Sequence, residues 1–193
     1  TDVVDHTLSV YDARGLLQSV EYPNQQRLSF AYGEEGLERI VTPLGNVLQV
    51  ECRGGRILQI TDEIGRRTQY RYEGDLLVDV VHTDEGITHY EYDENGHISS
   101  VTDQNGSCYL ENEYDVKGRV TRQNFSSGVY QIFTYDDTHR RNTIYYSETG
   151  KTEIYEYNNR FLKERVIYED GSFQTYQYSD DNLKVEEISR LGS

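Results

Sequence analysis

The sequence predicts an all-β protein in which tandem antiparallel β-hairpin repeats of about 21 residues each form a continuous coiled sheet. Three observations predict this fold class. Turn-forming residues return at a nearly constant interval, a tyrosine stands at the same place in almost every interval, and the interval is too short to hold a crossover helix. The stretch THYEYDENGHISSVTDQNG, residues 88–106, reads as strand, turn, strand and turn.

Glycines set the period of the repeat. Their spacings are 20, 21, 20, 22, 22, 21 and 21 residues, for Gly45, Gly65, Gly86, Gly106, Gly128, Gly150, Gly171 and Gly192. Asn24 and Asp5 continue the series toward the N-terminus. Asn and Asp are the non-glycine residues that best tolerate a left-handed backbone, so we interpret this slot as a turn position that needs a positive φ.

A tyrosine marks the predicted end of the first strand in each unit. It occurs at Tyr11, Tyr32, Tyr72, Tyr92, Tyr114, Tyr135, Tyr157 and Tyr178, and Cys52 fills the remaining slot of the nine. A second aromatic residue often precedes it by two, which places both rings on one face of the strand. Residues 1–193 are therefore predicted to be a single array of about nine hairpin units.

Each unit contains two turns with related sequences. The first turn reads Tyr-Asp-x-x-Gly at residues 11–15, 92–96 and 114–118, and the second reads Thr-Asp-x-x-Gly at 61–65 and 102–106. The Asp side chain can accept hydrogen bonds from backbone N–H groups ahead of it, and the Gly closes the loop. Residues 1–5 fit the second turn, and the sequence has no Met, so we expect a segment of a longer or processed protein.

Two strands and two turns in each period force neighbouring strands to run antiparallel. The product is a meander of about 18 strands, which at about 4.8 Å between strands would be roughly 85 Å wide. Twisted open sheets rarely exceed about 10 strands without curling or splitting. The sheet is therefore predicted to coil.

The apolar residues of the second strand are spaced by three, which a flat strand would place on opposite faces. Examples are Leu37 with Ile40, Ile57 with Ile60, and Ile98 with Val101. A β-bulge would bring each pair back to one face, and partial cover of both faces would also explain the spacing. The sequence leaves both explanations open.

Composition restricts the partners. The formal net charge is −15 and the pI is about 4.7, which opposes binding to nucleic acid because phosphate contacts need clustered Lys and Arg. We interpret the acidity as a means of staying soluble. No stretch approaches the roughly 20 apolar residues of a membrane span, so none is predicted.

The sequence predicts no enzyme, no cofactor, and no catalytic, cofactor-binding or metal-binding residue. The histidines, at positions 6, 82, 89, 97 and 139, share no metal-ligand spacing. Carboxylates recur at turn slots, as at Asp12, Asp93 and Asp115 and at Asp62 and Asp103, which indicates a structural role. A row of such aspartates binding Ca²⁺ is the weaker alternative, because the nonapeptide calcium-binding pattern is missing.

The tyrosines and cysteines allow two further predictions. Aromatic rings can stack on sugars, but a sheet with so few other large apolar groups needs its 18 tyrosines for packing. We therefore predict that the tyrosine series belongs to the core, with sugar binding as the alternative. Cys52 and Cys108 lie three units apart, about six strand spacings, which is too far for a disulfide. Two free thiols are predicted.

The repeated Tyr-Asp-x-x-Gly followed by a basic and an aliphatic residue resembles the YD-repeat or RHS-repeat family. The best matches are residues 92–98 and 114–120, and the resemblance spans essentially the whole chain. Departures from Tyr-Asp occur at Tyr32-Gly33, Cys52-Arg53, Tyr72-Glu73, Tyr157-Asn158 and Tyr178-Ser179. In this family a self-cleaving segment closes the shell, and the sequence contains no match to that segment.

The resemblance implies a strip of hairpins that winds into a hollow β-shell, as in large secreted or surface-exposed bacterial proteins, insecticidal toxin complexes and the animal teneurins. This chain would form shell wall in a secreted or cell-surface bacterial protein. Its expected partners are flanking repeats of the same protein, an enclosed effector, and other copies pairing through edge strands. The alternative is an adhesion module that binds glycans or a protein.

Overall fold

The computed structural model describes residues 7–182 and 184–190. Within these ranges the backbone forms 18 β-strands, and it forms no helix that could cross a membrane. All the strands belong to one antiparallel sheet, which confirms the predicted fold class. The chain divides into two compact units, Thr1–Tyr90 and Glu91–Ser193.

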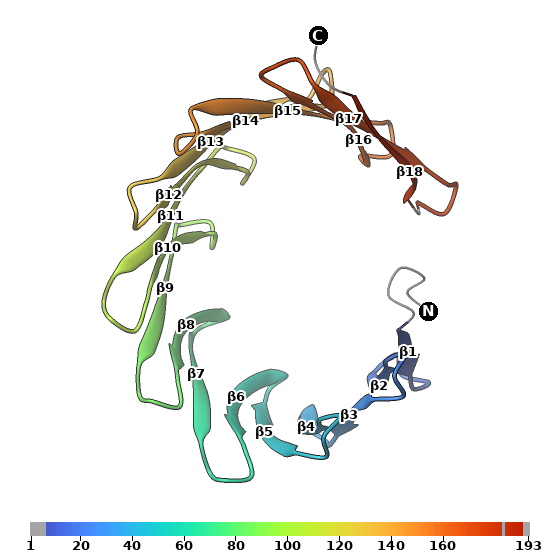
Figure 1. The fold of residues 1–193 in the computed structure, drawn as a ribbon. Helices are drawn as coiled ribbons and strands as arrows, with labels where there is room; N and C mark the ends of the chain where they lie inside the picture. The colour runs from blue at the N-terminus through green and yellow to red at the C-terminus, as the bar shows by residue number, and fades with distance from the viewer. Residues whose placement is uncertain (1–6, 183, 191–193) are drawn as a thin grey trace. The chain divides into compact units, whose positions relative to one another are not determined.

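The first unit is a run of hairpins in which each strand pairs with its neighbours in the sequence (Figure 1). Its strands are β1 (Leu8–Tyr11), β2 (Leu17–Glu21), β3 (Arg27–Tyr32), β4 (Leu37–Val41), β5 (Val47–Arg53), β6 (Arg56–Thr61), β7 (Arg67–Glu73), β8 (Leu76–Val81) and the beginning of β9 (Ile87–Tyr92). The predicted tyrosines lie at or one residue before the end of their first strands, for example Tyr11 at the end of β1 and Tyr72 one residue before the end of β7.

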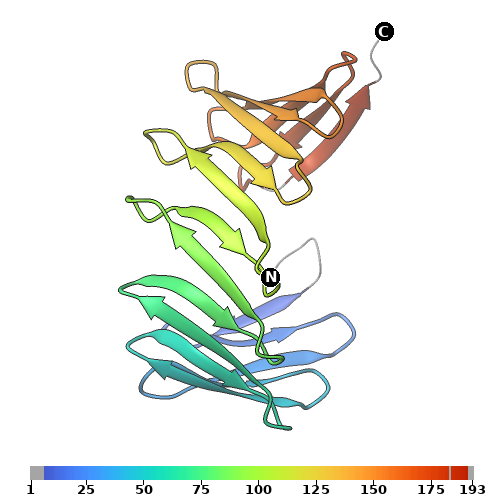
Figure 2. The ribbon, with the colours of Figure 1, turned by 90° about the vertical axis from the view of Figure 1, so that its left-hand side faces the viewer.

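The second unit continues the same pattern, with strands joined by short turns at alternating ends (Figure 2). Its strands are β10 (Ile98–Thr102), β11 (Cys108–Tyr114), β12 (Val120–Phe125), β13 (Tyr130–Asp136), β14 (Arg141–Tyr146), β15 (Lys151–Tyr157), β16 (Lys163–Tyr168), β17 (Phe173–Tyr178) and β18 (Lys184–Arg190). The predicted meander is confirmed, and the predicted coiling of the sheet stays a prediction.

First and second turns with the Asp-x-x-Gly sequence share one geometry. In the first turn after β1, the N–H of Asp12 donates to the carbonyl of Leu16 at 2.9 Å, and the N–H of Gly15 donates to the carbonyl of Asp12 at 3.0 Å. The second turn after β10 repeats both bonds through Asp103 and Gly106. Gly15 and Gly106 have φ of 80° and 77°, so the predicted need for a left-handed residue is confirmed at these positions.

Two positions of the predicted left-handed series were wrong by one residue. The structure gives positive φ to Gln25 (64°) and Glu85 (67°), where the sequence pointed to Asn24 and Gly86. The physical reason is the turn's hydrogen bond, because the N–H of the left-handed residue must reach the carbonyl three residues earlier. Gln25 and Glu85 make this bond, each at 3.0 Å. Residues 1–5 and 192 of the predicted series lie outside the described residues.

A one-residue β-bulge explains the apolar spacing of three. Ala31 pairs with Arg39 and Tyr32 pairs with Leu37, so Glu38 is the extra residue in β4. Phe30 pairs with Ile40, and since residues two apart share a face, the partners of Phe30 and Tyr32 share that face too. The question left open by the sequence is thus decided in favour of the bulge.

The bulge recurs in most hairpins built on a first turn. Register shifts of the same kind occur in the pairs β1/β2, β5/β6, β7/β8, β11/β12, β15/β16 and β17/β18. The hairpin of β13 and β14 differs, because its register runs without a shift from Gln131 and Tyr146 to Asp136 and Arg141. The repeat therefore changes its geometry at this hairpin.

The core is a thin layer on the sheet. Its most buried apolar side chains are Val50, Val80, Val101, Val166 and Tyr176, each exposing at most 9% of its surface. Three of these valines, Val80, Val101 and Val166, come from second strands. Because the layer is thin, contacts between neighbouring hairpins carry much of the packing.

Candidate functional site

The first-strand tyrosines bind the preceding repeat through their hydroxyl groups. Tyr72 donates to the carbonyl of Ile57 at 2.9 Å, and Tyr135 donates to the carbonyl of Val120 at 2.7 Å. The same inter-repeat bond joins Tyr32 to Leu17, Tyr114 to Ile98, and Tyr178 to Lys163. A half-buried ring with a bonded hydroxyl fits the predicted packing role better than an open surface for sugars.

Cys52 occupies the slot of the missing tyrosine and makes a related contact. Its Sγ lies 3.0 Å from the carbonyl oxygen of Leu37, the residue that follows the preceding first turn. A thiol is a weaker donor than a phenol, so this link is the weakest of the series described here. Cys52 and Cys108 are both free thiols, as predicted.

The basic residue of the repeat covers the tyrosine ring. The His97 ring stacks on Tyr114 with 4.8 Å between ring centroids. The Arg119 guanidinium carbon lies 4.2 Å from the Tyr135 ring centroid, which is within cation–π range. The last two residues of the Tyr-Asp-x-x-Gly-basic-aliphatic motif thus both contact the tyrosine of the next repeat. The basic side chain covers the ring, and the backbone carbonyl of the aliphatic residue accepts the hydrogen bond from the hydroxyl.

The turn aspartate fixes both the loop and the basic residue. Asp115 Oδ1 accepts hydrogen bonds from the N–H groups of Lys117 (2.9 Å) and Arg119 (3.0 Å), and its Oδ2 accepts one from Arg119 Nε at 2.9 Å. Together these bonds hold the pKa of Asp115 below its ordinary value, and the bond from the backbone N–H of Arg119 has the largest effect. A carboxylate kept ionised and engaged in this way is poorly suited to general acid chemistry.

Gly118 is required by contact as well as by conformation. Its φ is +75°, and a Cβ at this position would lie 2.7 Å from His97 Nε2 of the preceding repeat. Gly128 has a similar φ of +81° but nothing within 4 Å of its Cβ position. Gly118 thus also leaves room for the stacked His97 ring.

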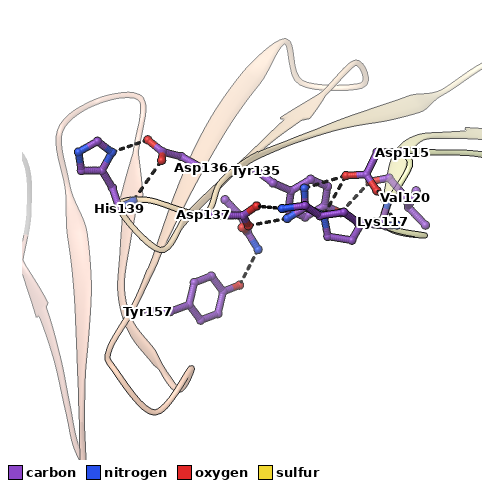
Figure 3. Close-up of polar contacts among 10 residues, drawn as sticks. Asp115, Lys117, Val120, Tyr135, Asp136, Asp137, His139 and Tyr157 are labelled. Carbon is purple, nitrogen blue, oxygen red and sulfur yellow. Dashed lines mark hydrogen bonds and ion pairs between the residues drawn. The ribbon is translucent and has the colours of Figure 1, made fainter.

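The repeat is altered between β13 and β16. Arg140 (φ 50°) and Phe161 (φ 59°) take the left-handed position of their turns, where earlier first turns use glycine. Two aspartates stand side by side here, Asp136 as the last residue of β13 and Asp137 as the first residue of the turn. Asp136 Oδ2 lies 2.6 Å from His139 Nδ1, while Asp137 pairs with Lys117 and with Arg119 Nη1, the latter at 2.6 Å (Figure 3).

An open cleft of about 580 Å³ lies beside this altered turn. We call it the Phe161 cleft, and its lining includes Lys117, Arg140, Asn142, Tyr157 and Phe161. The Tyr157 hydroxyl lies 3.4 Å from Asn142 Nδ2 (Figure 3). Tyr157 therefore differs from the tyrosines that donate to a backbone carbonyl, because its hydroxyl accepts from Asn142, and both residues line the cleft.

Comparison with known proteins places this geometry in a family. The family model for the teneurin YD-shell matches residues 3–113. The chain belongs to the teneurin YD-shell family. The resemblance to YD repeats and RHS repeats predicted from the sequence is thereby confirmed. No curated protein matches the chain.

Solved structures similar to this YD-shell chain include two crystal structures. The structure of TcdB2-TccC3-TEV has 16% sequence identity and a TM-score of 0.57, and covers 97% of this chain and 11% of that chain. The structure of TcdB2-TccC3 has 16% identity and a TM-score of 0.56, and covers 95% of this chain and 11% of that chain. At this identity the likeness shows the fold, and the YD-shell chain spans about a tenth of the length of each.

The histidines of this YD-shell chain are engaged by neighbouring polar groups. His82 Nε2 lies 2.8 Å from Thr88 Oγ1, and His89 Nδ1 lies 2.7 Å from Asp79 Oδ1. His97 and His139 face turn aspartates, and His6 lies outside the described residues. In the described part of the chain no group of three or more His, Cys, Asp and Glu is placed to hold a metal ion. The absence of catalytic, cofactor and metal sites stays a prediction.

Sequence reasoning missed two features of the YD-shell repeat. It did not identify the carbonyl acceptors of the tyrosines, because they lie about 15 residues back and become neighbours only when one hairpin packs on the next. It also passed over Arg140 and Phe161. The available signal was the glycine missing from their first turns, which start at Tyr135 and Tyr157.

Proposed function

We propose that this chain is a non-enzymatic structural segment that forms part of the wall of a hollow β-shell, in a large secreted or cell-surface bacterial protein of the RHS type. The array of about nine hairpin units, residues 1–193, would be one portion of that wall. The shell would enclose a toxin or another effector. Family membership and the fold of the solved neighbours support a structural shell role.

The observation that carries the proposal is the recurring inter-repeat bond. The hydroxyl of one repeat reaches the carbonyl of the one before it, as from Tyr72 to Ile57 and from Tyr135 to Val120. Because the contact recurs with little change, it fixes the placement of each hairpin on its neighbour. The wall of a shell needs this kind of contact. The repeated residues hold one hairpin on the next, and few of them remain for catalysis.

The state of the polar side chains supports a non-enzymatic role. Turn aspartates such as Asp93 and Asp103 have a lowered pKa because backbone N–H groups donate to them. They carry their charge at neutral pH and are held by the loop they close. Catalytic acids and bases usually have pKa values moved toward the working pH, which is the opposite arrangement.

The proposed partners follow from the sheet. The registered partner of β1 is β2 and that of β18 is β17, so the second edge of each terminal strand can pair with a flanking repeat of the same protein. The same edges can pair with another copy when the flanking repeats are missing. An enclosed effector is the further partner that a shell would have.

Small-angle X-ray scattering over a concentration series tests the proposal. We expect an elongated, curved particle whose apparent mass rises with concentration as edge strands pair. The same measurement on a longer protein with its flanking repeats should show a closed, hollow particle. A compact monomer near the radius of a 193-residue globule, about 16 Å, would contradict the wall role and favour an adhesion module.

A further inference from the structure

Two neighbouring turns hold bulky residues in a conformation that favours glycine. First turns with the Tyr-Asp-x-x-Gly sequence place a glycine with positive φ at the fourth turn residue, namely Gly15, Gly96 and Gly118. In the next two repeats the residues with positive φ in the first turns are Arg140, at the end of a four-residue loop, and Phe161, at the position of the glycine. A left-handed backbone brings Cβ close to the following carbonyl oxygen, so both residues are strained.

Burial of the Phe161 side chain does not compensate for this strain. The side chain is 77% exposed, so it removes little apolar surface from water. The turn sets the left-handed backbone of Phe161, as it does at Gln25 and Glu85, because the N–H of Phe161 donates to the carbonyl of Asn158 at 3.0 Å. The turn does not require an aromatic side chain, and the exposed ring is available to contact a ligand.

Arg140 and Phe161 line the same cleft, together with Asn142 and Tyr157. The volume of about 580 Å³ is in the range of pockets for small ligands. One exposed aromatic ring beside amide, phenol and guanidinium groups provides a face for stacking and several hydrogen-bonding groups around it. This combination suits a molecule with an apolar face and a rim of hydroxyls.

The charges around the cleft balance. Asp137 pairs with Lys117 and Arg119, and Asp136 pairs with His139. Arg140 donates from Nε to the carbonyl of Tyr157 at 3.3 Å. Paired charges give little attraction for an anion or a cation, and the net charge of −15 further opposes anions. The ligand that fits is uncharged.

A peptide fits this cleft less well. Peptides commonly bind by adding a strand to a free sheet edge, but β14 and β15 are paired with each other here. The backbone at the turn is also engaged, since the N–H of Tyr157 donates to the carbonyl of Arg140 at 3.0 Å. The cleft thus offers side chains and an aromatic ring in place of unpaired backbone.

We propose that the Phe161 cleft binds a neutral saccharide of one or two rings. The sugar face stacks on Phe161, and Arg140 and Asn142 donate hydrogen bonds to its hydroxyls. The site is separate from the first-strand tyrosines that bond to backbone carbonyls. It is also independent of the wall role, because a shell segment can carry a sugar site on a turn.

Saturation-transfer NMR on the full chain tests this site. The probes are methyl glycosides of glucose, galactose and mannose, N-acetylglucosamine, lactose and cellobiose. We expect at least one probe to bind, and Phe161→Gly to weaken its binding by about fivefold or more. Phe161→Tyr, which keeps a ring, should retain binding. Ile64→Ala is the matched control, because Ile64 is a 78% exposed turn residue that does not line this cleft.

Three results would overturn the inference. They are a wild-type chain that binds no probe, binding that Phe161→Gly leaves unchanged, and equal losses in Phe161→Gly and Ile64→Ala. Circular dichroism of each variant excludes misfolding as a cause of lost binding, and Phe161→Gly relieves strain, so it should fold. The scattering experiment is independent of these outcomes, so failure of the wall role and failure of the sugar site can be told apart.

Discussion

Replacing Gly118 by Ala should destabilise the chain more than replacing Gly128, and the difference should depend on His97. Both glycines have a positive φ, 75° and 81°. An L-residue in this conformation costs about 1–2 kcal/mol, partly offset by the stiffer unfolded chain. Gly128→Ala should therefore cost about 1 kcal/mol, because its Cβ would meet nothing within 4 Å.

Gly118→Ala adds a collision. The new Cβ would lie 2.7 Å from His97 Nε2, so the imidazole ring must move. It would lose its stack on Tyr114, worth about 0.5–1.5 kcal/mol, together with its 3.0 Å contact with the exposed carboxylate of Asp93. With the cost of the left-handed alanine, the expected total is about 1.5–2.5 kcal/mol.

Urea unfolding followed by circular dichroism measures these costs as changes in the free energy of unfolding. The decisive comparison is a double-mutant cycle, because in a His97→Ala background the extra cost of Gly118→Ala should disappear. Hydrogen exchange in β11 and β12 should locate the loss if the array unfolds in steps. Equal costs for Gly118→Ala and Gly128→Ala, or an extra cost that survives His97→Ala, would refute the reasoning.

Three other changes give separate tests. Tyr135→Phe removes the donor to the carbonyl of Val120 and should cost about 1–2 kcal/mol in urea unfolding; an unchanged midpoint would mean that the inter-repeat bond does not hold the units together. Phe161→Gly should raise the free energy of unfolding by about 1 kcal/mol, since it relieves a left-handed phenylalanine; a lower melting temperature would show that the ring is packed. The folded pKa of Asp103 is depressed, so its contribution is present above the unfolded pKa of about 3.9 and is lost as the pH falls through the folded value. Asp103→Asn keeps an acceptor oxygen without titrating, so the difference in urea midpoint between pH 7 and pH 3 should shrink; an equal difference would contradict this assignment.

Much of the fold could be predicted because the turns of each repeat are specified by residues within the turn itself. Asp and Gly at fixed offsets specify the loop, and the tyrosine marks the strand end, as at Tyr92 and Tyr114. The bulge could not be decided, because the spacing of Leu37 and Ile40 fits either explanation until the partner strand is known. Residue propensity also pointed to Asn24, whereas the turn's hydrogen bond places the left-handed residue at Gln25.

The candidate site was less predictable than the fold. The packing role of the tyrosines followed from composition, but their acceptors depend on how one hairpin lies on the next. The sequence signal at Arg140 and Phe161 is the absence of the expected turn glycine, and a search for chemical motifs does not detect an absence. Its meaning depends on the φ of these residues and on the exposure of the phenylalanine ring, and both are properties of the folded chain.

The inter-repeat bond has a consequence for how such a chain is made. Each tyrosine reaches back only 15 or 16 residues, as from Tyr72 to Ile57 and from Tyr114 to Ile98. Every hairpin therefore finds its partners among residues synthesised just before it, and the contact order is low for an all-β protein. Folding can advance hairpin by hairpin behind the ribosome, so that only the newest strand has an unpaired edge open to aggregation.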